Sequence, residues 1–189
     1  MIPVFYSPVQ VVYDDVGASP SARKPQEVVA SWLAAKFPIM IKEPTPATVE
    51  DFCRAHDPDF VQGILSGQTS NGFGTKHASV AESLPWTSGS MLSAARHVLQ
   101  GGAPVAVSPS SGFHHASYQK AEGFCTFNGL MVTVLALRAD GHRGKIGILD
   151  LDEHYGNGTA DILVRVGESN VEHYTFGRED LHRGDGARW

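Results

Sequence analysis

Apolar positions along the chain predict strands and helices in alternation. Short apolar runs predict strands over residues 1–6, 37–41, 105–107, 146–150 and 171–176. Apolar residues spaced three and four apart predict helices over residues 26–36, 48–56, 57–65, 87–99, 128–139 and 159–166. This alternation is typical of an α/β fold whose mostly parallel sheet is flanked by helices on both faces.

Two segments depart from simple amphipathic patterning. Residues 128–139 are apolar nearly all round, which predicts a central, buried helix. Residues 67–85 are polar and glycine-bearing and predict a long surface loop, of the kind that is usually functional or mobile. The sequence contains no clear linker and no repeat. We therefore expect residues 1–189 to form a single domain.

The strand that begins at residue 146 ends in an Asp-x-Asp-x-His pattern. Alternate strand residues point the same way, so Asp150, Asp152 and His154 can project together from its carboxyl end, the edge where open α/β sheets bind ligands. A carboxylate and an imidazole two residues apart are natural ligands for Zn²⁺. Upstream, the adjacent His114 and His115 could serve such a site as a proton shuttle. The pattern favours a metal-dependent enzyme.

Composition narrows the class of protein. A net charge of −5 argues against a nucleic-acid surface or an anionic membrane face. Cys53 and Cys125 have no CxxC neighbour, so neither a disulfide framework nor a cysteine zinc site is expected. No stretch approaches the about 18 consecutive apolar residues of a membrane helix, and the first residues do not resemble a signal peptide. The expected location is cytoplasmic.

Three motifs, SGFHHA, EGFCTFNG and ILDLDEHYGNGTADIL, occur in an order and spacing that resembles the histone deacetylase superfamily, which includes bacterial acetylpolyamine amidohydrolases. The resemblance implies an arginase/deacetylase-like fold. It also implies a zinc-dependent hydrolase that removes acetyl or short acyl groups from an amine. The expected substrate is an acylated amine, either an acetyl-lysine peptide or an acetylpolyamine.

The resemblance assigns roles to individual residues. Asp152 and His154 match two of the family's three zinc ligands. His115 matches the general base and acid, which takes a proton from a water activated by the metal and returns it to the leaving amine. Asn157 matches the residue that orients His115. Since an amide cannot stabilise an imidazolium by charge, this pairing favours His115 over its neighbour as the shuttle.

The neighbouring positions complete the implied site. His114 would bond to Asp150, which holds the orientation of that imidazole and stabilises its charged form. Gly123 and Phe124 match the lining of the narrow tunnel that admits an acyl-lysine-like side chain.

A monovalent cation is also implied. Thr175 and Phe176 fall where the family binds an ion such as K⁺. Asp150 and the backbone carbonyls of Asp152 and His154 would complete that site.

Two elements of the family's site have no clear match in this sequence. The family takes its third zinc ligand, an aspartate, and an oxyanion-stabilising Tyr or His from sequence well beyond the metal strand. Asp180, His182 and Asp185 are nominal substitutes, but no strand is predicted to position them. The chain is thus expected to be the amino-terminal half of a catalytic domain. The alternative is a catalytically incomplete binding or assembly module that keeps the fold and part of the metal site.

Other classes fit less well. A binuclear arginase-like hydrolase needs a carboxylate where this chain has Gly156, and a Rossmann domain needs a GxGxxG that is absent after the first strand. Trp86 and Phe73 are expected to be exposed and would mark a contact between copies in a homo-oligomer. Six histidines without ligand spacing are expected at the surface or in structural hydrogen bonds: His56, His77, His97, His142, His173 and His182.

Overall fold

A computed structural model describes residues 1–14, 16–17 and 19–177 of the chain. Its strands are β1 (Ile2–Phe5), β2 (Ile39–Lys42), β3 (Ile146–Asp150) and β4 (Val171–Thr175). Its α-helices are α1 (Lys24–Ala34), α2 (Val49–Ala55), α3 (Pro58–Leu65), α4 (Ala78–Leu99), α5 (Gly129–Ala139) and α6 (Asn157–Val166). The predicted α/β fold is confirmed.

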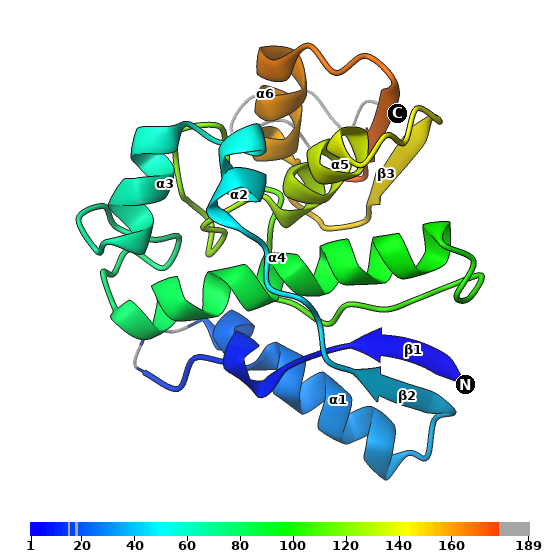
Figure 1. The fold of residues 1–189 in the computed structure, drawn as a ribbon. Helices are drawn as coiled ribbons and strands as arrows, with labels where there is room; N and C mark the ends of the chain where they lie inside the picture. The colour runs from blue at the N-terminus through cyan, green and yellow to red at the C-terminus, as the bar shows by residue number, and fades with distance from the viewer. Residues whose placement is uncertain (15, 18, 178–189) are drawn as a thin grey trace.

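The strands of the described part form two parallel pairs (Figure 1). β1 pairs with β2, and β3 pairs with β4 so that Asp150 at the end of β3 lies opposite Thr175 at the end of β4. The predicted buried strand at 105–107 is wrong in extent, because only Val107 bridges to Val4 and Val105 is 51% exposed. Prolines at positions 104 and 109 bracket this segment, and they cannot donate the backbone bonds that a longer ladder needs.

The long helix α4 separates the β1–β2 pair and α1 from the part of the molecule that holds α5, β3 and β4 (Figure 1). It contacts both α5 and β1. The predicted loop at 67–85 is therefore wrong beyond His77, because α4 begins at Ala78 and continues through Pro85. Burial of Val80 and Leu84 stabilises this first part of the helix despite the proline.

Two aromatic residues expected at the surface are not fully exposed. Trp86 and Phe73 are both half-buried. Trp86 lies within α4, and Phe73 packs toward Phe124 with ring centroids 6.0 Å apart. Neither side chain forms the exposed apolar surface that was predicted.

α5 is the centre of the largest apolar core, as its all-round apolar pattern predicts. Its fully buried Met131 and Val132 belong to one cluster with Phe52 and Phe127, whose rings lie 4.5 Å apart. Ile148 of β3 joins the same cluster. Packing of Ile148 in the core therefore fixes β3, the strand that leads to the candidate site. In the described part of the chain, no helix is long and apolar enough to cross a membrane.

Two buried polar residues connect this core to the histidine loop. Asn128 caps α5 by accepting a bond from the backbone N–H of Met131, 3.1 Å away, and its amide donates to the carbonyl of Ala116 at 3.1 Å. The backbone N–H of Asn128 donates to Nε2 of His56 at 2.9 Å, and Nδ1 of His56 lies 2.9 Å from the carbonyl of Ser117. His56 is thus a hydrogen-bonded structural histidine, as predicted.

Acid should destabilise the protein through His56. Burial lowers the pKa of His56 from 6.5 to about 4, which outweighs its backbone hydrogen bonds to Ser117 and Tyr118. The folded state therefore holds His56 neutral where the unfolded chain already takes up a proton. This contribution to stability is full above pH 6.5 and is lost as the pH falls toward about 4. We expect a loss of roughly 3 kcal/mol, at about 1.4 kcal/mol per pKa unit.

The measurement is the free energy of unfolding of wild type and His56→Gln as a function of pH. The variant should be less stable at neutral pH but should show a flatter slope between pH 6.5 and 4. Equal slopes in the two proteins would contradict this assignment.

Candidate metal and proton-transfer site

The end of β3 and the loop that follows it carry the acidic part of the site. Asp150 closes the strand, and its Oδ1 accepts a bond from the backbone N–H of Asp152 at 3.1 Å. Oδ1 of Asp152 in turn accepts from the backbone N–H of His154 at 2.8 Å. These local bonds are the turn chemistry that aspartate favours, and they fix the loop between β3 and α6.

The start of α6 holds the histidine loop against β3. The backbone N–H of Thr159 donates to the carbonyl of His114 at 3.1 Å. Gly158 permits this close approach, since a Cβ at that position would lie 2.4 Å from the carbonyl oxygen of Ala116. With the amide of Asn128 bonded to the same carbonyl, the loop is tied to both α5 and α6.

His114 forms an ion pair with Asp150. Nδ1 of His114 lies 2.8 Å from Oδ2 of Asp150, and the two side chains are only 12% and 9% exposed. Burial lowers the pKa of His114, but the hydrogen bond and charge of Asp150 outweigh it, so the net pKa is raised. Burial raises the pKa of Asp150, and the bond to His114 outweighs this to lower it. Both shifts favour the charged pair.

His115 faces an amide instead of a carboxylate. Its Nδ1 lies 2.6 Å from Oδ1 of Asn157, the first residue of α6. Its ring centroid lies 4.1 Å from that of His114 and 5.6 Å from that of His154. The geometry brings the two histidines of the loop together with His154 and gives each of the two a different partner.

The side chains of Asp152 and His154 bring two atoms that can coordinate a metal close together. Oδ1 of Asp152 and Nδ1 of His154 lie 2.9 Å apart, and both side chains are about half exposed. Zinc bonds of about 2.0–2.2 Å to oxygen and nitrogen allow two donors at this separation to reach one ion, so the pair fits zinc. The described residues include no group of three His, Cys, Asp or Glu positioned to hold a metal. Asp180, His182 and Asp185 lie outside the described residues.

The residues of the implied monovalent-cation site also lie together. The backbone N–H of Phe176 donates to the carbonyl of Asp150 at 2.8 Å, and the hydroxyl of Thr175 accepts from the backbone N–H of Gly156 at 3.2 Å. Gly177 lies so close to the backbone of His154 that a Cβ there would be 2.1 Å from its carbonyl oxygen. The ends of β3 and β4 and the loop at residue 154 are therefore packed tightly.

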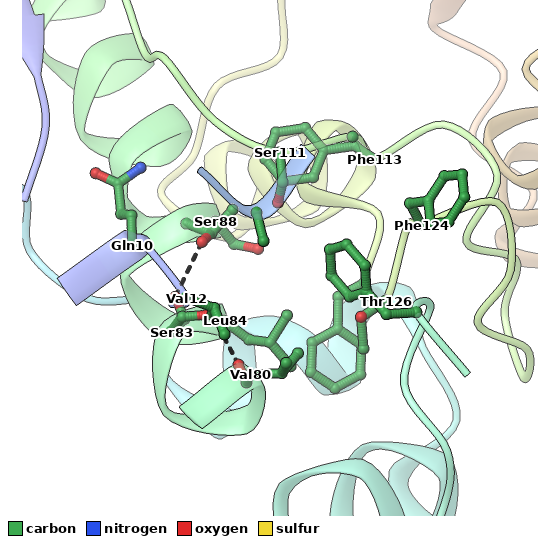
Figure 2. A pocket seen from close by; sticks show the side chains of 15 residues that line it. Gln10, Val12, Val80, Ser83, Leu84, Ser88, Ser111, Phe113, Phe124 and Thr126 are labelled. Atoms are coloured by element: carbon green, nitrogen blue, oxygen red, sulfur yellow. Dashed lines mark hydrogen bonds between the residues drawn. The ribbon is translucent and has the colours of Figure 1, made fainter. Parts of the chain in front are cut away.

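A wall of aromatic and glycine residues borders the histidines. Gly123 and Phe124 both have positive φ, +57° and +62°, and the partly exposed Phe124 ring lies beside Phe73. The backbone N–H of Phe124 donates to the carbonyl of Gly72 at 3.0 Å, which docks the loop at residues 67–77 on this wall. Figure 2 shows a pocket behind it, between Phe124, Phe113 and α4 residues such as Val80.

The surroundings of Gly156 distinguish a site for one metal ion from a binuclear site. A Cβ on Gly156 would lie 2.7 Å from Oδ2 of Asp150 and 3.0 Å from Nε2 of His173, so a carboxylate side chain there would clash. This disfavours the binuclear arrangement.

Two further residues lie close to the site. His173 of β4 is half-buried, and burial lowers its pKa. The sequence patterns had assigned no role to Glu122, which the structure brings within 2.9 Å of Asn157.

Comparison with known proteins finds similarity to named deacetylases. Residues 20–175 match the family model of the histone deacetylase domain. Histone deacetylase 2 of Oryza sativa subsp. japonica is 27% identical over 160 residues, covering 77% of this chain and 31% of that protein. A probable deacetylase of Methanothermobacter thermautotrophicus is 23% identical over 167 residues, covering 86% of this chain and 50% of that protein.

Comparison of structures gives the same fold. The crystal structure of the HDA15 HD domain matches with a TM-score of 0.78 at 20% identity, over 91% of this chain and 52% of that one. The chain thus spans about half, or less, of the length of these relatives.

Proposed function

The chain belongs to the histone deacetylase family, and on that premise we propose that its residues form part of a zinc-dependent site that hydrolyses an acylated amine. The observation that carries the proposal is the placement of His115 beside His154, with ring centroids 5.6 Å apart. A proton-transfer group thereby adjoins the two donors that fit zinc, Asp152 and His154. The described residues do not place a third ligand beside this pair.

In this proposal zinc, when bound, supplies Lewis-acid polarisation of the amide carbonyl and acidifies the attacking water. Nε2 of His115 takes a proton from that water and returns it to the leaving amine, while Asn157 holds the ring through Nδ1. The pair of His114 and Asp150, whose charged form both pKa shifts favour, is proposed to steady the electrostatics of the site and the position of the histidine loop. Thr175, Phe176 and Asp150 are proposed to hold a monovalent cation such as K⁺.

The proposed substrate is an acetyl-lysine peptide or an acetylpolyamine. Gly123 lets the His115 ring pack against the backbone, and the Phe124 ring offers an apolar wall for a methylene chain. The loop at residues 67–77, which places Phe73 beside Phe124, is the part proposed to select between substrates.

Steady-state hydrolysis of an acetyl-lysine peptide and of N-acetylputrescine by the zinc-loaded full-length protein tests this proposal. Hydrolysis of at least one substrate, its loss on chelation and its return with zinc would support the proposal. A protein that binds zinc but hydrolyses neither substrate would contradict it.

Gly123→Ala should slow this reaction by displacing His115. A Cβ at position 123 would lie 2.3 Å from Cδ2 of His115, so the ring must move. Misplacing a reacting group by about 1 Å can cost about 10²-fold in rate, and we expect a fall in kcat toward that size. The measurement is kcat on the better substrate.

Gly101→Ala is the matched control for this variant. Gly101 lies after α4, outside the candidate site, and has a similar left-handed φ of +77° but nothing within 4 Å of its would-be Cβ. Both variants carry the backbone cost of roughly 1–2 kcal/mol, and only one moves the histidine. Equal losses of kcat would contradict the displacement.

A further inference from the structure

Both ends of the Asn157 side-chain amide are engaged. Its Oδ1 lies 2.6 Å from Nδ1 of His115, and its Nδ2 donates to Oε1 of Glu122 at 2.9 Å. An ionised carboxylate only accepts hydrogen bonds, so Glu122 must face the NH₂ end of the amide. The amide oxygen is then obliged to face His115.

The orientation of this amide decides where His115 carries its proton. A neutral imidazole has one N–H and one bare nitrogen. Because an oxygen faces Nδ1, the proton is favoured on Nδ1, and Nε2 keeps the lone pair that can accept a proton. A flipped amide would present N–H to Nδ1 and favour the opposite tautomer, which cannot act as a base through Nε2.

We propose that Glu122 is a positioning residue, which fixes the amide of Asn157 and thereby keeps His115 in the tautomer that accepts a proton at Nε2. This inference rests on the proposed role of His115 as the proton acceptor. Glu122 itself touches neither the reacting atoms nor the candidate metal ligands.

Glu122 is held in place for this role from two sides. Its backbone N–H donates to the carbonyl of Cys125 at 3.1 Å, and the N–H of Cys125 donates back at 2.9 Å. Its second carboxylate oxygen pairs with the exposed Lys120. The hydrogen bond from Lys120 lowers the pKa of Glu122, which keeps the carboxylate an acceptor.

His114 needs no such positioning residue. It contacts the carboxylate of Asp150 directly, and both oxygens of a carboxylate accept hydrogen bonds, so either orientation serves. His115 meets an amide, whose two ends differ, and Glu122 removes the ambiguity. Glu122 therefore orients His115 indirectly, through the side chain of Asn157.

The test measures the tautomer directly. The full-length protein is prepared with ¹⁵N-labelled histidine, metal-free and zinc-loaded, about two pH units above the ordinary histidine pKa of ~6.5. The His115 signals are assigned by their loss in His115→Gln. Wild type should have its proton on Nδ1, and Glu122→Gln should shift a measurable fraction to Nε2, because a glutamine side chain can face either end of the amide. Glu172→Gln is the matched control, since it makes the same change at an exposed glutamate that pairs with Lys145 and should leave the tautomer unchanged.

A double-variant cycle separates positioning from simple structural support. In the protein that keeps Asn157, Glu122→Gln should lower kcat by roughly 10- to 100-fold, the range typical of outer-shell partners around a metal site. In the Asn157→Asp background the new carboxylate would repel Glu122, and the glutamine amide could donate to it. Glu122→Gln should therefore raise kcat there.

The outcomes are distinct. An unchanged His115 tautomer in Glu122→Gln, or an equal loss of kcat in both backgrounds, would overturn the positioning role. A wild-type protein that hydrolyses no acylated amine would instead refute the proposed function, and the tautomer measurement would still decide the role of Glu122.

Discussion

Replacing His154 with alanine is expected to abolish both zinc retention and amide hydrolysis. The variant removes one of the two donors that lie 2.9 Å apart, and catalytic zinc usually needs three protein ligands. His154 is half exposed and lies in a loop, so the fold should survive the change. Zinc per chain, hydrolysis rate and Tm are measured on the same full-length preparation.

The matched control is His142→Ala, in the turn before β3. It removes a histidine of the same chain outside the candidate site and should keep wild-type zinc and activity. Wild-type zinc content and turnover in His154→Ala would refute the ligand assignment.

Replacing His115 with alanine is expected to leave the zinc content intact but to slow hydrolysis by roughly 10²–10⁴-fold, the usual worth of positioned acid–base catalysis. His115 contacts Asn157 through Nδ1, which leaves Nε2 for proton transfer. His114→Ala should cost less in kcat, because in the proposed mechanism His114 transfers no proton. The comparison is kcat of the two variants at equal zinc loading.

The effects of the two variants on the free energy of unfolding should follow the opposite order. His114→Ala leaves Oδ2 of the nearly buried Asp150 without its partner, while Oδ1 keeps the backbone N–H of Asp152, and this should cost about 1–3 kcal/mol in the free energy of unfolding. His115→Ala leaves only an amide oxygen unpaired and should cost less. If His114→Ala proves the more damaging variant in kcat at full zinc loading, the two roles are reversed.

Strong local patterns predicted the fold where they matched the tertiary environment. The all-round apolar run of residues 128–139 became the buried α5, and the apolar run at residue 146 became β3, with Asp150 at its end. The helix predicted over residues 57–65 also formed, and the Asp57 side chain caps it as α3. In each case one local signal and one burial requirement agree.

The errors came from segments where long-range packing decides. The polar, glycine-bearing composition of residues 67–85 predicted a loop, but burial of Val80 and Leu84 continues α4 through Pro85. The apolar residues at 105–107 predicted a strand, but only Val107 reaches β1. Sequence alone cannot show which neighbour a segment will have.

The candidate site divides in the same way. The spacing of Asp150, Asp152 and His154 follows from the alternation of strand residues, and the motif resemblance paired His115 with Asn157, two positions that the structure brings within 2.6 Å. Glu122 lay inside one of the quoted motifs, but its contact with Asn157 joins residues 35 apart in sequence. No local signal marks such a contact.

Anomalous diffraction at the zinc edge from crystals of the zinc-loaded full-length protein tests the ligand assignment most directly. Asp152 and His154 are expected to hold the ion, so one strong peak should lie about 2.0–2.2 Å from Oδ1 of Asp152 and Nδ1 of His154. That peak should adjoin Nε2 of His115. A zinc peak bound by other residues, with Asp152 and His154 free of metal, would contradict the site proposed for this chain.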